Sequence, residues 1–86
     1  MPKIASFYGI DIYMYYLDHN PPHFHVRYAG LKATVEIQTG RVISTELPSR
    51  AVRLVLEWHS QNQAELLDLW EQSRRGEPLT PIKTLF

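Results

Sequence analysis

The chain has 86 residues, of which 44% are hydrophobic and 12% aromatic. That content suffices for one compact domain with a hydrophobic core and argues against an intrinsically disordered chain. Nine basic and nine acidic residues give a formal net charge of zero, so overall charge predicts no attraction to nucleic acid or to an anionic membrane. With zero net charge, copies of the chain do not repel one another electrostatically, so a homo-oligomer is possible. Because the chain has no cysteine, disulfide bonds, thiol catalysis and cysteine-ligated zinc are excluded.

The sequence also bears on location. No apolar run approaches the length of a membrane span, and the first residues, Met1-Pro2-Lys3-Ile4, do not resemble a secretory signal. A cysteine-free chain is compatible with a reducing compartment. We therefore expect a single domain over residues 1–86 that is cytoplasmic and has no membrane partner.

The N-terminal half shows the period of two that is typical of β-strands. About four strands are expected between residues 4 and 47. The first segment, residues 4–8, is only a short β-prone piece, and residues 41–47 are the fourth candidate strand. The segments with this pattern are 4–8, 10–16, 23–28, 31–37 and 41–47. The register of the last segment stays open, because Val42 and Ile43 compete for its inner face.

From Pro48 onward the hydrophobic period becomes helical. Pro48-Ser49 is a favourable helix start, and the apolar stripe lapses at residues 59–61. Asn62 and Glu65 then have the spacing of a capping box. The sequence thus predicts two helices within about 49–75, ended by Gly76, with one kinked helix as the alternative.

These elements predict an α+β fold, in which an antiparallel sheet of about four strands is covered on one face by two C-terminal helices. The tail, residues 77–86, contains two prolines and is expected to be extended, with Ile82, Leu85 and Phe86 available to dock. His59, which falls near the end of the first predicted helix, is expected on the surface or beside the helix dipole. Trp58 and Trp70 are expected in the core.

The most unusual segment is Asp18-His19-Asn20-Pro21-Pro22-His23-Phe24-His25. Two consecutive prolines predict a rigid extended loop before the strand that begins at His23. If this strand pairs with the next through a tight turn at Ala29-Gly30, the inner face holds Phe24, Val26, Ala33 and Val35. The opposite, outward face then holds His23, His25, Arg27, Lys32, Thr34 and Glu36.

Two kinds of chemistry fit that outward face. His19, His23 and His25 are candidate acid–base catalysts, with Glu36 to orient an imidazole. Arg27, Lys32 and Tyr15 are then candidate substrate-binding residues, of which the two cations could hold a phosphate.

Alternatively, His19, His23 and His25 could ligate a metal, with Glu36 or Asp18 as a fourth ligand or a second-shell partner. No cofactor is predicted outright, but zinc or another divalent transition metal fits this second interpretation. A third interpretation assigns no chemistry: strand histidines are often exposed, and Asp and Asn are common turn residues.

Several stretches of the chain carry a resemblance to a known family: Ile4-Ala5-x-Phe7-Tyr8-Gly9-Ile10, Met14-Tyr15-Tyr16, Asp18 to Val26, Glu36-Ile37-x-Thr39-Gly40, Glu46-Leu47-Pro48, Val55-x-Glu57-Trp58 and Gly76-Glu77-Pro78-Leu79. Together they span nearly the whole chain and resemble an uncharacterised bacterial family, the domain of unknown function numbered 4160. The resemblance implies a small stand-alone protein encoded beside another small uncharacterised protein. The two together have been proposed as a toxin–antitoxin module. The resemblance to this family implies no catalytic residues, because none is established for its members.

We therefore expect a component of such a two-protein module, the toxin rather than the antitoxin, because the chain lacks a charged, disordered neutralising segment. It would act on RNA or another phosphate-bearing target through the histidine-rich face. The alternatives are a non-enzymatic protein-binding module, whose partner is the small neighbouring protein, and a histidine-ligated metal-binding domain. Whether the protein is an enzyme stays open at this level.

Overall fold

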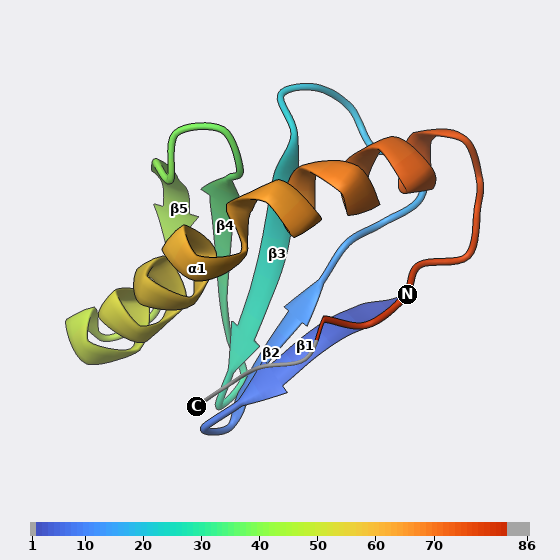
Figure 1. Ribbon diagram of the computed structural model, residues 1–86. Coiled ribbons are helices and arrows are strands. Elements are labelled where there is room, and N and C mark those ends of the chain that lie inside the picture. Colours follow the sequence, from blue (N-terminus) through green and yellow to red (C-terminus); the bar gives the residue numbers. More distant parts are fainter. Residues whose placement is uncertain (1, 83–86) are drawn as a thin grey trace.

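The computed structural model describes residues 2–82, which form one antiparallel sheet and one long helix. The strands follow one another in chain order across the sheet (Figure 1). Each strand is antiparallel to the next, so the sheet is a simple meander. The strands are β1 (Lys3–Phe7), β2 (Ile10–Tyr13), β3 (His23–Tyr28), β4 (Leu31–Glu36) and β5 (Val42–Thr45).

The sheet has five strands rather than about four, because the short piece at the start of the chain is a full edge strand. β1 pairs with β2 from Lys3 to Phe7 through a bulge. β5 also contains an irregularity: Thr34 faces Ser44 while Val35 faces Val42, so Ile43 is an extra residue. Val42 therefore packs on the inner side, and Ile43 is 41% exposed.

The pairing of β3 with β4 is as expected from the sequence, with Tyr28 opposite Leu31 and His23 opposite Glu36. Phe24, Val26, Ala33 and Val35 are all buried by this register. The α+β class and the expected inner face are therefore confirmed.

One helix, α1 (Ser49–Arg74), takes the place of the two expected helices. Its backbone leaves helical geometry at Asn62, so the kinked-helix alternative is correct. The Asn62 side chain does not start a new helix but donates to the carbonyl of Trp58, 2.9 Å away. The two halves of α1 run in different directions across one face of the sheet (Figure 1).

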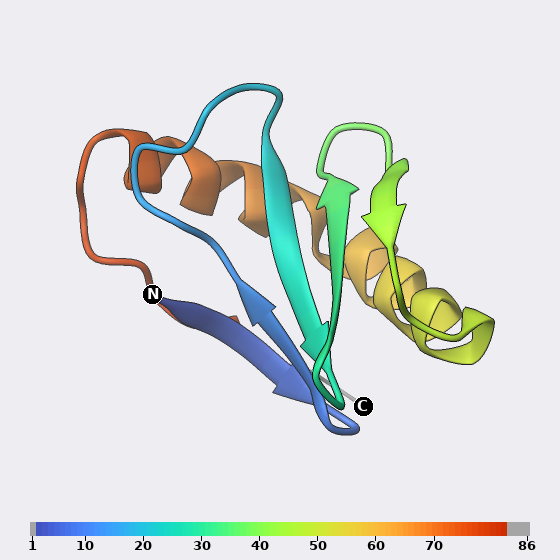
Figure 2. The ribbon, with the colours of Figure 1, turned by 180° about the vertical axis from the view of Figure 1, so that it is seen from behind.

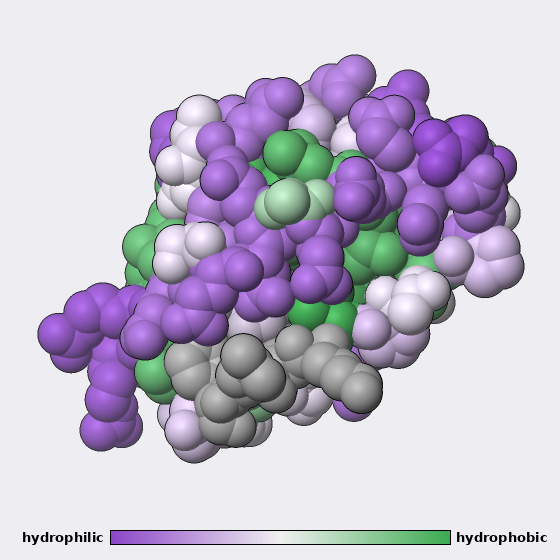
Figure 3. All heavy atoms as spheres, viewed as in Figure 1, coloured by the Kyte–Doolittle hydropathy of each residue, from purple (hydrophilic) through white to green (hydrophobic). Residues whose placement is uncertain are grey.

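The core lies between this helix and the sheet. Trp58 and Trp70 are buried there as expected, and the Trp58 ring contacts Phe7 and Phe24. The outward side of the helix is mainly hydrophilic, and hydrophobic atoms show between it and the sheet (Figure 3). The tail docks at Ile82, whose N–H donates to the Ile4 carbonyl. Leu85 and Phe86, which were also expected to dock, lie outside the described residues.

No segment among residues 2–82 combines the length and the apolar character that a helix needs to cross a membrane. The sheet face that points away from α1 is crossed by no helix (Figure 2). That face carries His25, whereas His23, at the start of β3, packs against Trp70 of α1.

Candidate functional site

The loop from residue 14 to residue 22 connects β2 to β3 and carries Asp18. It passes beside the C-terminal half of α1 (Figure 1). Two hydrogen bonds fix it there: Leu17 N–H donates to the Ser73 carbonyl, and Arg74 Nη1 donates to the Asp18 carbonyl. Leu17 also has a positive φ of 55°, which is uncommon for a residue with a side chain. The loop is thus held in a defined and locally strained shape immediately before Asp18.

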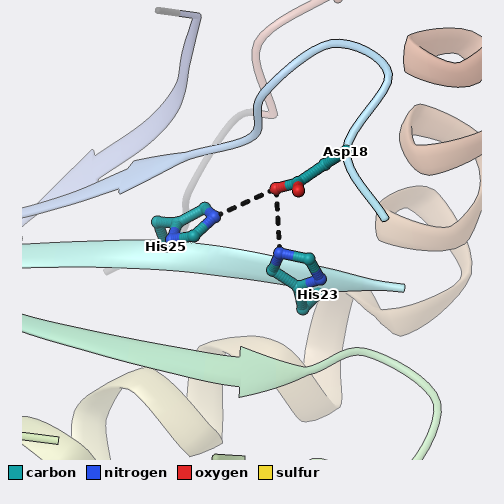
Figure 4. A group of neighbouring side chains, drawn as sticks. All are labelled: Asp18, His23 and His25. Carbon is teal, nitrogen blue, oxygen red and sulfur yellow. Dashed lines mark hydrogen bonds and ion pairs between the residues drawn. The ribbon is translucent and has the colours of Figure 1, made fainter. Parts of the chain in front are cut away.

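The Asp18 carboxylate lies over the start of β3, between two imidazole rings (Figure 4). Its Oδ2 atom is 2.9 Å from His23 Nε2 and 3.2 Å from His25 Nε2. These three residues, named here the Asp18 cluster, each offer one ligand atom, and all three atoms lie within 4.8 Å of one another. Two nitrogen atoms and one carboxylate oxygen are a donor set that binds transition metals.

His23 is the most enclosed member of the cluster. Its ring packs against Trp70 at 5.3 Å between centroids, and the residue is buried, although the sequence predicted an exposed position. The loop and the second half of α1 cover it. Its Nδ1 lies 2.8 Å from the Pro21 carbonyl, which can only accept a hydrogen bond. Nδ1 therefore carries a hydrogen, and Nε2 is the atom that faces Asp18.

Two groups of the cluster have shifted pKa values. Burial acts to raise the pKa of Asp18, but hydrogen bonds from the His19 backbone N–H and from the His25 and His23 rings outweigh it, so the pKa is lowered. Burial lowers the pKa of His25, and the attraction of Asp18 only partly opposes that effect. At neutral pH these directions favour a carboxylate beside a neutral His25 ring, which are the forms that bind metals.

The structure does not bring all the predicted catalytic residues together. The His19 ring is 85% exposed, and its Nδ1 lies 3.0 Å from the other oxygen of Asp18, outside the three-residue cluster. Glu36 lies opposite His23 in the register, but its carboxylate pairs with Arg41 Nε at 3.3 Å. The carboxylate that contacts the imidazoles is therefore Asp18, not Glu36.

The predicted substrate-binding residues border His25 on its other side. The Tyr15 ring lies 4.4 Å from the His25 ring. Arg27 and Lys32 face each other across β3 and β4, one step farther along the same sheet face. All three line a depression of about 300 Å³, named here the cationic groove, together with His25, Val26, Ala33, Thr34 and Ser44.

A second depression, also of about 300 Å³, lies on the other side of His25. His19 and His23 line it, and it shares His25 and Thr34 with the cationic groove. The two depressions therefore meet at His25, beside the Asp18 cluster.

The segment that builds this site falls within a match to a known family. Residues 9–71 match the family described as Domain of unknown function (DUF4160). The chain belongs to this family. No curated protein and no solved structure matches the chain. All members of the Asp18 cluster, as well as Arg27 and Lys32, lie inside the part that this DUF4160 chain shares with its family.

Sequence reasoning named Asp18 only as one option for a fourth ligand, although this carboxylate is central. Glu36 was preferred because cross-strand pairing gives an explicit neighbour, whereas a loop gives none. The available signal was the short spacing from Asp18 to the Pro-Pro pair, since a loop that turns back over its own strand brings its first residues close to that strand.

Proposed function

We propose that Asp18, His23 and His25 bind a divalent transition-metal ion, with zinc as the first candidate, and that this ion serves chemistry on a phosphate-bearing target. The observation that carries the proposal is the convergence of two imidazole nitrogens on one carboxylate oxygen, at 2.9 and 3.2 Å. Two atoms that bind one ion at about 2.0–2.1 Å, with about 90–110° between them, lie about 2.9–3.4 Å apart. The two separations from Asp18 Oδ2 match that range, and the ligand atoms of all three residues lie within 4.8 Å of one another.

The outer contacts of His23 also support the proposal. Its Nδ1–H donates to the Pro21 carbonyl, so Nε2 is the atom whose lone pair would bind an ion shared with the carboxylate. Two lone pairs at 2.9 Å repel unless a cation lies between them. A backbone carbonyl on the second ring nitrogen is the usual support for a histidine that binds metal. A proton on Nε2 would relieve the same repulsion, so the ion itself has to be measured.

Three protein ligands leave a coordination position for water or substrate, as in catalytic rather than structural zinc sites. Zinc held by these three residues would supply Lewis acidity, which lowers the pKa of a bound water toward 7. The Asp18 cluster adjoins two depressions from which a substrate could reach that position. This supports a hydrolytic role.

The test is metal analysis of protein purified without a histidine tag, followed by titration of the metal-stripped protein with zinc. We expect about one ion per chain in the wild type, and a loss of affinity of roughly 10-fold or more in Asp18→Asn and His25→Gln. His19→Gln is the matched control, because His19 is exposed and outside the cluster. Substoichiometric metal in the wild type after zinc titration, or equal affinity in all variants, contradicts the proposal.

The Asp18–His25 contact also favours a metal-free candidate function. If His25 Nε2 carries a hydrogen, it donates to Asp18, and Nδ1 is then available as a general base. An acid–base enzyme of this kind would not lose activity when metal is removed. Activity that survives chelation and depends on His25 would replace the metal site with this alternative.

We further propose that the protein is the toxin of a cytoplasmic two-protein module, with the small protein encoded beside it as antitoxin. Its well-formed fold and the absence of a charged, disordered segment within residues 2–82 support toxin over antitoxin. Induced expression is then expected to arrest growth, and co-expression of the neighbour to restore it.

The matched variants for this growth assay are Asp18→Asn and His25→Gln, with His19→Gln as the control that retains the arrest. Circular dichroism must show that each variant is folded. Growth at the uninduced rate during wild-type expression contradicts the toxin role, and arrest by Asp18→Asn contradicts a role for the cluster in it.

A further inference from the structure

Two positive charges lie side by side on the sheet face beside the Asp18 cluster. Arg27 and Lys32 are directly opposite each other across β3 and β4, and both are exposed. Like charges in directly opposite positions destabilise a sheet. A pair of this kind therefore calls for a compensating partner.

The carboxylates around this pair are engaged elsewhere. Asp11 lies opposite Arg27 on β2, but its Oδ1 accepts from Ser6 Oγ at 2.8 Å and lies 3.8 Å from Lys3 Nζ. Among residues 2–82, no ion pair joins either cation of the groove to a carboxylate.

Within residues 2–82, the remaining neighbours make no ion pair with these side chains either. Glu46 accepts from the backbone N–H of Lys32, not from its ammonium group. The Arg27 guanidinium lies over the Tyr13 ring, 5.8 Å from its centroid. Both cations are thus available to a ligand that approaches the face.

The groove around them has further groups that bind anions. His25 faces Thr34, and Thr34 faces Ser44, so two hydroxyls continue a polar row across β3, β4 and β5. Arginine, lysine and hydroxyl side chains are the groups that most often contact nucleic-acid phosphates. Tyr15 adds an aromatic ring at the junction of the groove with the Asp18 cluster. A base could stack on such a ring while its phosphate lies on the cations.

We propose that the cationic groove binds the phosphodiester backbone of a single-stranded oligonucleotide. The neutral chain supplies no overall attraction, so binding depends on this local pair of charges. Binding alone needs no metal. The placement of a bound phosphate next to a catalytic ion rests on the proposed function.

The experiment measures fluorescence anisotropy of a labelled single-stranded RNA, and of DNA of the same sequence, in the presence of EDTA. Arg27→Gln and Lys32→Gln are expected to weaken binding about fivefold each. Each lost phosphate contact should also reduce the slope of log K against log salt concentration by about 0.7. The matched control is Arg50→Gln with Arg53→Gln, which removes two exposed charges from α1 on the opposite side of the sheet.

The stability of the variants separates binding from folding. Removal of one like charge should leave the midpoint of thermal unfolding unchanged or slightly higher, so weaker binding cannot be attributed to unfolding. Unchanged affinity in the Arg27→Gln, Lys32→Gln double variant overturns the proposal, as does an equal loss in the α1 control.

A third arm tests the nature of the ligand. Inorganic phosphate is compared with chloride at matched ionic strength. It should displace the oligonucleotide only weakly, because a single phosphate ion cannot contact both cations and also stack on the aromatic ring. Full displacement at low phosphate concentration would show a free-phosphate site and overturn the oligonucleotide assignment. Because EDTA is present throughout, failure of the metal proposal leaves these results unaffected.

Discussion

His59 is a buried histidine of α1 that hydrogen-bonds to the backbone beyond the end of β4. It was expected near a helix end, but α1 continues past it, and the residue is buried against Phe24. Its Nε2–H donates to the Ile37 carbonyl at 2.6 Å, and Gln63 donates to the same carbonyl at 3.1 Å. These bonds attach the turn between β4 and β5 to the middle of the helix. The polar ring was read as a surface group because its acceptor lies 22 residues away along the chain.

Gly40 makes that arrangement possible, and its substitution gives a test at the residue scale. Its φ is +76°, and a Cβ atom there would lie 3.1 Å from His59 Cε1. Gly40→Ala is therefore expected to combine backbone strain with a displaced His59 ring, and to lower the free energy of unfolding by about 1–3 kcal/mol. Denaturant unfolding measures this change.

Gly30→Ala is the matched control for the strain alone. Gly30 has a similar φ of +80°, but a Cβ atom would meet nothing within 4 Å. Gly30→Ala should lower the free energy of unfolding by a smaller amount, about 1 kcal/mol. Equal losses at the two positions would mean that the close approach to His59 contributes nothing.

At the scale of elements, the sequence predicted most where the hydrophobic period was regular. The register of β3 and β4 follows from the tight turn and the alternation of Phe24 and Val26 with polar residues, and it is confirmed. The sequence predicted a boundary between two helices where α1 has its kink. The apolar helical pattern is interrupted near Asn62 whether the chain forms two helices or one kinked helix. In the structure, α1 runs from Ser49 to Arg74 as one helix that is kinked at Asn62.

The loop from residue 14 to residue 22 was the least predictable element, although its sequence is the most distinctive. Its position depends on Ser73 and Arg74, which bond to Leu17 and Asp18 from more than 50 residues away along the chain. No local pattern reports a contact of that kind. The site could therefore be located from its histidines, whereas its central carboxylate required the tertiary structure.

In the whole molecule, the Asp18 cluster lies where three parts of the fold meet. The loop contributes Asp18, β3 contributes both histidines, and the second half of α1 supplies Trp70 against His23. An ion bound there would link the loop to the sheet in the folded chain. The unfolded chain has no comparable arrangement of ligands, so the ion should favour the native state.

Thermal unfolding with and without zinc measures that effect across the whole domain. At free zinc about 100 times the dissociation constant, binding to the native state alone adds about 2.7 kcal/mol of stability. For a domain of this size, that corresponds to a rise in Tm of roughly 10–20 °C, which EDTA should reverse. A 10-fold loss of affinity in Asp18→Asn would leave about half of this stabilisation, about 1.4 kcal/mol, whereas His19→Gln should show all of it. A zinc-dependent rise of the same size in Asp18→Asn would mean that the ion binds elsewhere, because only the wild-type cluster has the carboxylate that joins the loop to β3.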